Sequence, residues 1–341
     1  MRAAVLYGKE DIRIENISSP ALKPGEVRIA IQTALTCGTD LKVYKRGYHA
    51  KMIVPPAVFG HELAGTISER HPSLNGWVVG DRVVVANSAP CGKCFYCRND
   101  QENLCDDLLF LNGAYAEEIV VPARLVEKNL LRIKPATTFR DAALTEPLAC
   151  VVQAMSEMEL NGTERILILG SGPIGLMFAA LMKHLGCTVS LAGRGESRLN
   201  TAARFGADVI DVGASGDMLS AVKTTGKRFD AVIEAIGKPE AWETAIQSVR
   251  KGGTVNFFGG CPSGTFVRFD TGLIHYSNLR LLASFHHTPA TIRKALAYIE
   301  AGAISARDFV DQESTLSELP GLFRSMLQGN RAVKTAIDVN S

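Results

Sequence analysis

A short glycine turn constrains the fold of this chain more than any other segment. Residues 170–175 read GSGPIG, directly after the apolar run RILIL and at the start of a helical pattern. Strand, glycine turn and helix in this order are typical of dinucleotide-binding folds, because the glycines let the backbone approach a pyrophosphate and the helix N-terminus favours its charge. An ordinary tight turn is the alternative. We predict that the cofactor is bound by Gly170, Gly172, Pro173, Ile174 and Gly175.

The rest of the second half of the chain predicts a parallel sheet. Apolar segments recur at residues 188–193 (TVSLAG), 229–237 (FDAVIEAIG) and 252–260 (GGTVNFFGG), with helical stretches between them. Strands that are apolar throughout and separated by helices indicate a parallel sheet covered on both faces. The sequence therefore predicts an α/β fold for this half.

The end of the segment TVSLAG bears on which cofactor is bound. An acidic residue here would bind the ribose 2′-hydroxyl of NAD, but the chain continues with Gly193 and Arg194. Arg194 and Arg198 offer charge and planar donor groups to a 2′-phosphate. We expect NADP to be preferred, with NAD possible; the alternative is that both arginines are solvated surface residues.

The first half of the chain has a different pattern of apolar and turn-forming residues. Residues 1 to about 145 contain short segments of strand-like composition separated by turn signals, among them residues 27–36, 63–68, 81–87 and 116–123. After about residue 285, two helical stretches precede a plausible strand at residues 332–339. This half is predicted to be mostly β.

Four cysteines form the strongest metal-binding pattern. Cys91, Cys94, Cys97 and Cys105 follow a C-x2-C-x2-C-x7-C spacing in a polar segment. Four thiolates complete a tetrahedron around zinc and leave no open position, which marks a structural site. Iron–sulfur ligation, a nucleic-acid zinc ribbon and unliganded thiols are the alternatives.

A second set of possible metal ligands is scattered along the chain. Cys37, His61, Glu62 and Glu146 provide the thiolate, imidazole and carboxylates expected of a catalytic zinc that keeps a position open. Taken singly, each has an ordinary interpretation as a core or surface residue. Sequence alone does not bring them together.

Charge and hydropathy exclude several classes of partner. The chain has 37 basic and 35 acidic residues, interspersed, for a net formal charge of +2. This balance gives no basic surface for nucleic acid or membrane. Apolar runs fall well short of the roughly 18 residues of a membrane span, and the N-terminus lacks the apolar core of a signal peptide. We expect a cytoplasmic protein with a small-molecule substrate.

The order and spacing of these motifs resemble one enzyme family. TCGTD (36–40), GHELAG (60–65), GDRV (80–83), the four cysteines, EPLA (146–149) and GSGPIG together resemble the zinc-dependent medium-chain dehydrogenase/reductase family, particularly its sorbitol (polyol) and threonine dehydrogenase branch. The resemblance implies a GroES-like, mostly β catalytic domain at residues 1–149 and 286–341. It also implies a Rossmann domain with a doubly wound parallel sheet at residues 150–285.

The resemblance also implies roles for single residues. Cys37, His61 and Glu62 would bind a catalytic zinc, Glu146 would be a fourth or exchangeable ligand, and the four cysteines would hold a structural zinc, giving two zinc ions per subunit. Thr39 would contact the substrate alcohol and pass on its proton, and Asp40 would orient the site. The family often has a relay histidine where this chain has Lys42. Relatives are usually homodimers or homotetramers.

The implied activity is oxidation of a secondary alcohol of a polyol, cyclitol or sugar derivative to a ketone by hydride transfer to NAD(P). Two alternatives stay open. One is a dehydrogenase of a threonine-type amino alcohol or of a sugar acid. The other is a non-catalytic, nucleotide-binding zinc protein, which would not depend on Cys37 or His61.

Overall fold

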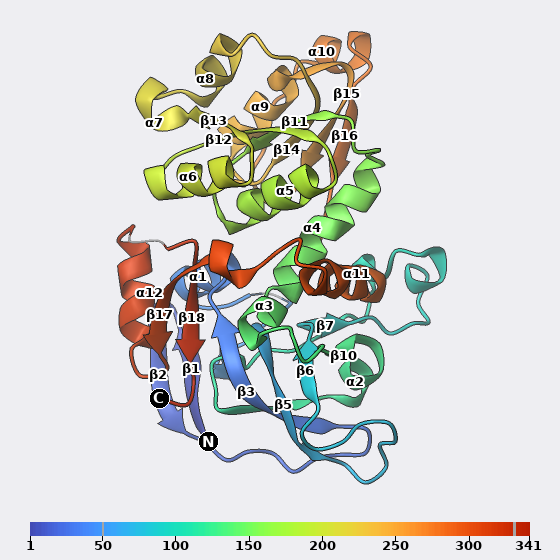
Figure 1. Cartoon of the computed structure of the whole chain (residues 1–341), viewed down its shortest axis with the longest axis vertical. Helices are drawn as coiled ribbons and strands as arrows, with labels where there is room; N and C mark the ends of the chain where they lie inside the picture. The colour runs from blue at the N-terminus through green and yellow to red at the C-terminus, as the bar shows by residue number, and fades with distance from the viewer. Residues whose placement is uncertain (50, 330–331) are drawn as a thin grey trace. The chain divides into compact units, whose positions relative to one another are not determined.

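The computed structural model describes residues 1–49, 51–329 and 332–341. It divides into two compact units (Figure 1). Unit 1 consists of Met1–Ala149 and His287–Ser341, and unit 2 of Cys150–His286. Helix α4 (Thr145–Met158) contains the boundary between them. In the described ranges, no helix combines the length and the apolar character of a membrane span.

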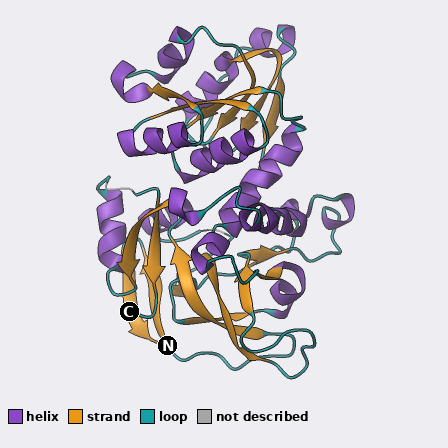
Figure 2. Cartoon of the chain, viewed as in Figure 1, coloured by secondary structure: helices purple, strands orange, loops and turns teal. Residues whose placement is uncertain are grey.

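Unit 1 is built around a mixed seven-stranded sheet, consistent with its strand-rich sequence (Figure 2). The strand order is β10-β6-β5-β3-β18-β17, and β9 also pairs with β3. Only β17 and β18 pair in parallel; the other pairs of this sheet are antiparallel. Smaller sheets contain β2-β1-β4 and β7-β8.

The strands of unit 1 are β1 (Arg2–Gly8), β2 (Asp11–Asn16), β3 (Val27–Leu35), β4 (Ala57–Val58), β5 (Glu62–Arg70), β6 (Arg82–Val85), β7 (Ser88–Ala89), β8 (Leu109–Phe110), β9 (Glu118–Val121), β10 (Leu130–Arg132), β17 (Val310–Thr315) and β18 (Lys334–Asp338). Its helices are α1 (Gly38–Arg46), α2 (Ala123–Asn129), α3 (Phe139–Ala143), α11 (Pro289–Glu300) and α12 (Leu319–Leu327), with 3₁₀ turns at Cys97–Asn99, Glu102–Leu104 and Ala306–Asp308. The strands predicted from the first half and from the tail are confirmed.

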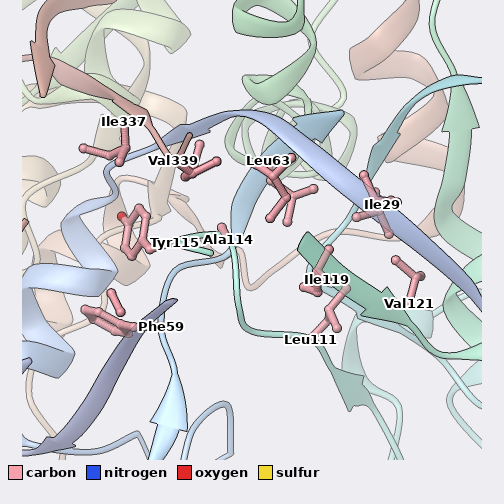
Figure 3. Packing of buried hydrophobic residues seen from close by; sticks show 14 of the residues in the cluster. Ile29, Phe59, Leu63, Leu111, Ala114, Tyr115, Ile119, Val121, Ile337 and Val339 are labelled. Atoms are coloured by element: carbon pink, nitrogen blue, oxygen red, sulfur yellow. The ribbon is translucent and has the colours of Figure 1, made fainter. Parts of the chain in front are cut away.

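The core of unit 1 explains why β3 is a strand. Val27, Ile29 and Ile31 alternate along it and are fully buried, as expected for a strand whose one face is covered. They belong to a hydrophobic cluster that also contains Phe59 and Tyr115 (Figure 3). The aromatic end of this cluster lies beside the residues that form the candidate site described below.

Unit 2 contains a six-stranded parallel sheet in the order β13-β12-β11-β14-β15-β16. Its strands are β11 (Arg165–Leu169), β12 (Thr188–Gly193), β13 (Asp208–Asp211), β14 (Phe229–Glu234), β15 (Val249–Phe257) and β16 (Arg280–Ala283). Its helices are α5 (Pro173–His184), α6 (Glu196–Arg204), α7 (Val212–Ser215), α8 (Met218–Thr224), α9 (Pro239–Ser248) and α10 (Thr271–Tyr276).

The connections in unit 2 run outward from β11 in both directions. Right-handed crossovers that proceed in opposite directions place their helices on opposite faces of a sheet. Accordingly, α5 packs with α6, whereas α8 packs with α9 (Figure 1). The predicted parallel sheet with helices on both faces, and with it the α/β fold class, is confirmed.

Candidate active site and metal centres

The ends of three neighbouring strands bring distant residues of unit 1 together. In β3, Leu35 pairs with Glu62 of β5 on one side and with Ala336 of β18 on the other. Both partner strands run antiparallel to β3, so the end of β3 lies beside the beginnings of β5 and β18. Cys37 follows β3 and Lys334 begins β18, so both reach the edge of the sheet where His61 and Glu62 lie.

Three of the four predicted catalytic metal ligands lie together at this edge. The ligand atoms of Cys37, His61 and Glu62 are all within 4.8 Å of one another. His61 and Glu62 are buried and Cys37 is partly buried. One sulfur, one ring nitrogen and one carboxylate form a donor set that suits a catalytic zinc with an open position.

Asp40 fixes the orientation of two of these ligands. Its Oδ1 lies 2.9 Å from Nδ1 of His61, which leaves Nε2 of that ring for a metal. Its Oδ2 accepts a hydrogen bond of 3.1 Å from the backbone N–H of Cys37, the N-cap of α1. A carboxylate that holds the second nitrogen of a ligand histidine is typical of zinc sites.

The electrostatic field at this cluster favours a cation. Burial alone would lower the pKa of His61, but the neighbouring side chains of Asp40 and Cys37 raise this pKa well above its usual range. A field that stabilises an imidazolium also stabilises a metal ion in the same place. The donor set and the field therefore both fit Zn²⁺.

The four cysteines of the polar segment form a second cluster. Their sulfurs all lie within 4.8 Å of one another, with separations of 4.0 Å for Cys91–Cys97, 3.5 Å for Cys94–Cys97 and 3.9 Å for Cys94–Cys105. A zinc tetrahedron with bonds of about 2.3 Å has sulfur–sulfur edges of about 3.8 Å. Hydrogen bonds from the backbone of Cys97 and Asp106 lower the pKa of Cys94 to about 6, whereas burial raises the pKa of Cys97 to about 12. The geometry fits a closed zinc site.

The glycine turn of unit 2 has the close contacts that a dinucleotide site needs. Gly172 is the N-cap of α5, and a Cβ added there would meet nothing within 4 Å. At Gly175, an added Cβ would lie 1.9 Å from the carbonyl oxygen of Gly170. Gly170 itself has a φ of 118°, in the region that favours glycine. Gly175 thus allows helix and strand to pack closely, and Gly172 leaves the helix N-terminus open to a ligand.

Two protein families match most of the chain. The alcohol dehydrogenase GroES-like domain matches residues 23–131, and the zinc-binding dehydrogenase domain matches residues 173–301. Among curated proteins, the L-threonine 3-dehydrogenase of Pyrococcus furiosus is 34% identical over 80% of this chain and 79% of its own length. The chain belongs to the zinc-dependent medium-chain dehydrogenase family.

Two further relatives support this assignment of the dehydrogenase. The D-altritol 5-dehydrogenase of Agrobacterium fabrum is 34% identical over 89% of each chain. Among solved structures, a zinc-binding dehydrogenase of Sinorhizobium meliloti bound to NADP is 27% identical and has a TM-score of 0.89, covering 99% of this chain and 98% of its own. The GroES-like match lies within unit 1 and most of the zinc-binding dehydrogenase match lies within unit 2, whereas the domain boundaries that the resemblance implies stay a prediction.

In the dehydrogenase, Glu62 has a partner that sequence analysis missed. Lys334 Nζ lies 2.7 and 2.5 Å from the two carboxylate oxygens of Glu62 and donates a further hydrogen bond of 3.1 Å to the carbonyl of Thr36. Burial would lower the pKa of Lys334, but Glu62 and Cys37 raise it, so the lysine is charged. A metal bound by Glu62 would share this carboxylate with Lys334.

Glu146 does not belong to the Cys37–His61–Glu62 cluster. It is buried in the first turn of α4, and burial raises the pKa of its carboxyl to about 7. Nε2 of His287 lies 3.8 Å from its Oε1 and 2.9 Å from Oδ1 of Asn87. A fourth or exchangeable ligand role for Glu146 stays a prediction.

Thr39 and Lys42 lie on α1 beside the cluster. The backbone N–H of Thr39 lies 3.4 Å from Cys37 Sγ, so this residue is next to the candidate metal site. Thr39 is partly buried and Lys42 is exposed. Three positions apart on a helix, they share one side of α1.

Arg194 follows β12 directly, at the end of the strand where a ribose would bind. Its backbone N–H and carbonyl both bond to the hydroxyl of Ser171, at 3.1 and 2.7 Å, which ties it to the glycine turn. Its guanidinium is exposed and lies 3.3 Å from the carbonyl of Gly216. Arg198 lies in α6, four residues further on, and is half-buried.

Lys334, His287 and Tyr115 are neighbours of the site that were not assigned to it from the sequence. Lys334 had a usable signal, since a lysine in the otherwise apolar tail segment AVKTAIDV suggests a buried charge partner. The other two gave none, because an isolated tyrosine or histidine is usually an ordinary core residue.

Proposed function

We propose that this dehydrogenase oxidises a secondary alcohol of a polyol, cyclitol or sugar derivative to the ketone, with NADP as the preferred hydride acceptor. The observation that carries the proposal is the buried Cys37–His61–Glu62 cluster oriented by Asp40. The relative named D-altritol 5-dehydrogenase supports the polyol class. The NADP-bound relative supports the cofactor.

Different residues of the chain would bind the metals, bind the cofactor and transfer the proton. Cys37, His61 and Glu62 would hold one zinc and the four cysteines another, and Gly170, Gly172 and Gly175 would hold the pyrophosphate. When bound, zinc supplies positive charge that lowers the pKa of an alcohol, and the nicotinamide accepts hydride. The Thr39 hydroxyl would accept the alcohol proton as it passes its own proton toward solvent, and Lys42, exposed on the same side of α1, would lie at the solvent end of that path.

A threonine-type amino alcohol is the second candidate substrate, favoured by the 34% identity to an L-threonine 3-dehydrogenase. Both candidates need the same metal cluster and the same transfer of hydride. They differ in the groups that flank the reacting carbon, and a panel of substrates separates them.

The test is reduction of NAD or NADP, offered separately, with polyols, cyclitols, sugar acids and threonine, followed by the absorbance of the reduced nicotinamide. We expect one polyol-type class to react, with NADP preferred and with loss of activity on addition of a zinc chelator. Cys37→Ser is the matched inactive control. Turnover that persists in Cys37→Ser, or reaction with threonine alone, would contradict the proposal.

Cytoplasmic location and a homodimer or homotetramer complete the proposal. Sedimentation or light scattering of the purified chain tests the subunit number.

A further inference from the structure

Tyr115 lies behind the candidate catalytic site and is fully buried. Its hydroxyl is 2.6 Å from Oδ2 of Asp40 and 3.2 Å from the carbonyl oxygen of Leu35. A phenol has a single proton to donate, and a carboxylate at the shorter distance is the stronger acceptor. The hydroxyl of Tyr115 therefore donates to Asp40.

Asp40 links two candidate metal ligands. Its Oδ1 faces Nδ1 of His61, and its Oδ2 accepts from the backbone of Cys37 as well as from Tyr115. Rotation of this carboxylate would disturb the imidazole and the N-cap of α1 together. The Tyr115 hydroxyl is the side-chain donor on Oδ2, so it restricts that rotation.

Tyr115 is itself held rigidly by the core of unit 1. Its backbone N–H donates to the carbonyl of Phe59 at 2.9 Å, and its carbonyl accepts from Ala4 at 2.8 Å. Its ring packs edge-on against Phe59, with ring centroids 5.8 Å apart (Figure 3). It also packs edge-on against Phe323, with centroids 6.1 Å apart. The side chain therefore has a fixed position relative to the sheet.

The same ring also contacts the segment that carries His61. A Cβ at Gly60 would lie 2.7 Å from the Tyr115 ring, and Gly60 has a φ of 88°. The ring thus occupies the space that any side chain at position 60 would need. Tyr115 holds His61 from two directions, through Asp40 at the imidazole and through Gly60 at the backbone.

We propose that Tyr115 is a positioning residue for the catalytic metal, whose hydroxyl fixes the Asp40 carboxylate so that His61 and Cys37 present their ligand atoms to one ion. This inference rests on the proposed metal site at Cys37, His61 and Glu62. Tyr115 itself touches neither metal nor substrate.

The test compares Tyr115→Phe with Tyr44→Phe. Tyr44 is a matched control because it is also buried and its ring packs on the same Phe323, with centroids 5.3 Å apart. Zinc retained per chain is measured against increasing concentrations of a chelator of known affinity. The chelator releases zinc from two sites. The variant Cys37→Ser lacks a ligand of the catalytic site, so comparison with it shows which release comes from that site.

We expect Tyr115→Phe to weaken zinc binding at the catalytic site by about tenfold, the lower end of the effect of residues that orient ligands. Tyr44→Phe should match the wild type, and zinc at the four cysteines should be unchanged in both. Because Tyr115 acts through Asp40, the double variant Asp40→Asn/Tyr115→Phe should bind zinc as weakly as Asp40→Asn alone.

Two outcomes would overturn the inference alone: equal zinc retention in Tyr115→Phe and Tyr44→Phe, or a full additional loss when Tyr115→Phe is combined with Asp40→Asn. In both cases Cys37→Ser would still lose one zinc. If instead Cys37→Ser retained as much zinc as the wild type, the proposed catalytic site would fail, and the inference with it.

Discussion

Lys334 donates hydrogen bonds to both carboxylate oxygens of Glu62, and neither side chain is more than 2% exposed. Removal of one partner from a buried ion pair leaves an uncompensated charge and costs about 3–5 kcal/mol. We expect Lys334→Met, which keeps the length and removes the charge, to lower the free energy of unfolding by this amount. Urea denaturation of metal-free protein measures it.

The control for this pair is Glu62→Gln/Lys334→Met. Replacement of both charges removes the unpaired carboxylate, so the double variant should be more stable than Lys334→Met alone. If the two variants unfold at the same urea concentration, the pair is not what stabilises this edge of the sheet.

Arg194→Ala should weaken NADP and leave NAD unchanged, because only NADP has a 2′-phosphate for the guanidinium to bind. A charge-assisted hydrogen bond is worth about 1.5–3 kcal/mol, so we expect the NADP dissociation constant to rise by about tenfold or more. Titration calorimetry with both cofactors measures the difference. Arg204→Ala, an exposed arginine in the last turn of α6, controls for net charge. Equal weakening of NAD and NADP would show that Arg194 contacts a group common to both.

Gly175→Ala and Gly172→Ala should separate folding from binding. An added Cβ at Gly175 would clash with the carbonyl of Gly170 at 1.9 Å, whereas at Gly172 it meets open space. Overpacking of this kind costs about 1–3 kcal/mol, so Gly175→Ala should destabilise the protein. Gly172→Ala should keep the stability of the wild type and lose nucleotide affinity. The prediction fails if Gly172→Ala binds NADP normally.

Zinc at the four-cysteine cluster should keep residues 91–105 in a defined structure. Cys94→Ser removes one of four sulfurs, and we expect the loss of one zinc per chain together with faster proteolysis within residues 91–105. Metal analysis and mapping of the cleavage sites check both. Cys261→Ser, a partly buried cysteine outside both clusters, should change neither. Normal zinc content in Cys94→Ser would argue against the site.

The contact between Arg132 and Asp81 should make a pH-dependent contribution to the stability of the protein. A hydrogen bond from Arg132 at 2.8 Å is the main cause that lowers the pKa of Asp81. A carboxyl whose folded pKa lies below its unfolded value of about 3.9 stabilises the fold above that pH, and the benefit is lost as the pH falls through the folded pKa. Asp81→Asn should therefore cost about 0.5–1 kcal/mol at neutral pH and nothing at strongly acidic pH. Urea denaturation of both proteins across this pH range tests the prediction. A difference in the free energy of unfolding that does not change with pH would contradict it.

The parts of the fold that sequence predicted well have local causes. Apolar runs predicted β11, β12, β14 and β15. A parallel strand that is buried on both faces is apolar along its whole length, so its own composition is enough to identify it. The four cysteines are close in sequence and are equally close in space. In both cases the information lies within a few adjacent residues.

The parts that sequence did not predict depend on strand register. The Lys334–Glu62 pair exists because β18 pairs with β3 and β3 with β5, and the composition of a strand does not show which distant strand becomes its neighbour. Tyr115 approaches Asp40 from a separate segment for the same reason. The resemblance supplied Cys37, His61 and Glu62 as a set, but not the residues that hold them.

The insertion of unit 2 within unit 1 has a consequence for biosynthesis. Glu62 precedes Lys334 by 272 residues, and the whole of unit 2 is translated between them. While the ribosome makes unit 2, β9 is already available to pair with Val27–Ala30 of β3, but Ala34 and Leu35 at the other end of β3 lack β18, and Glu62 lacks Lys334. The metal-binding end of unit 1 is therefore completed late, and the nascent chain carries a short unpaired stretch of β3 that invites chaperone protection until β18 arrives.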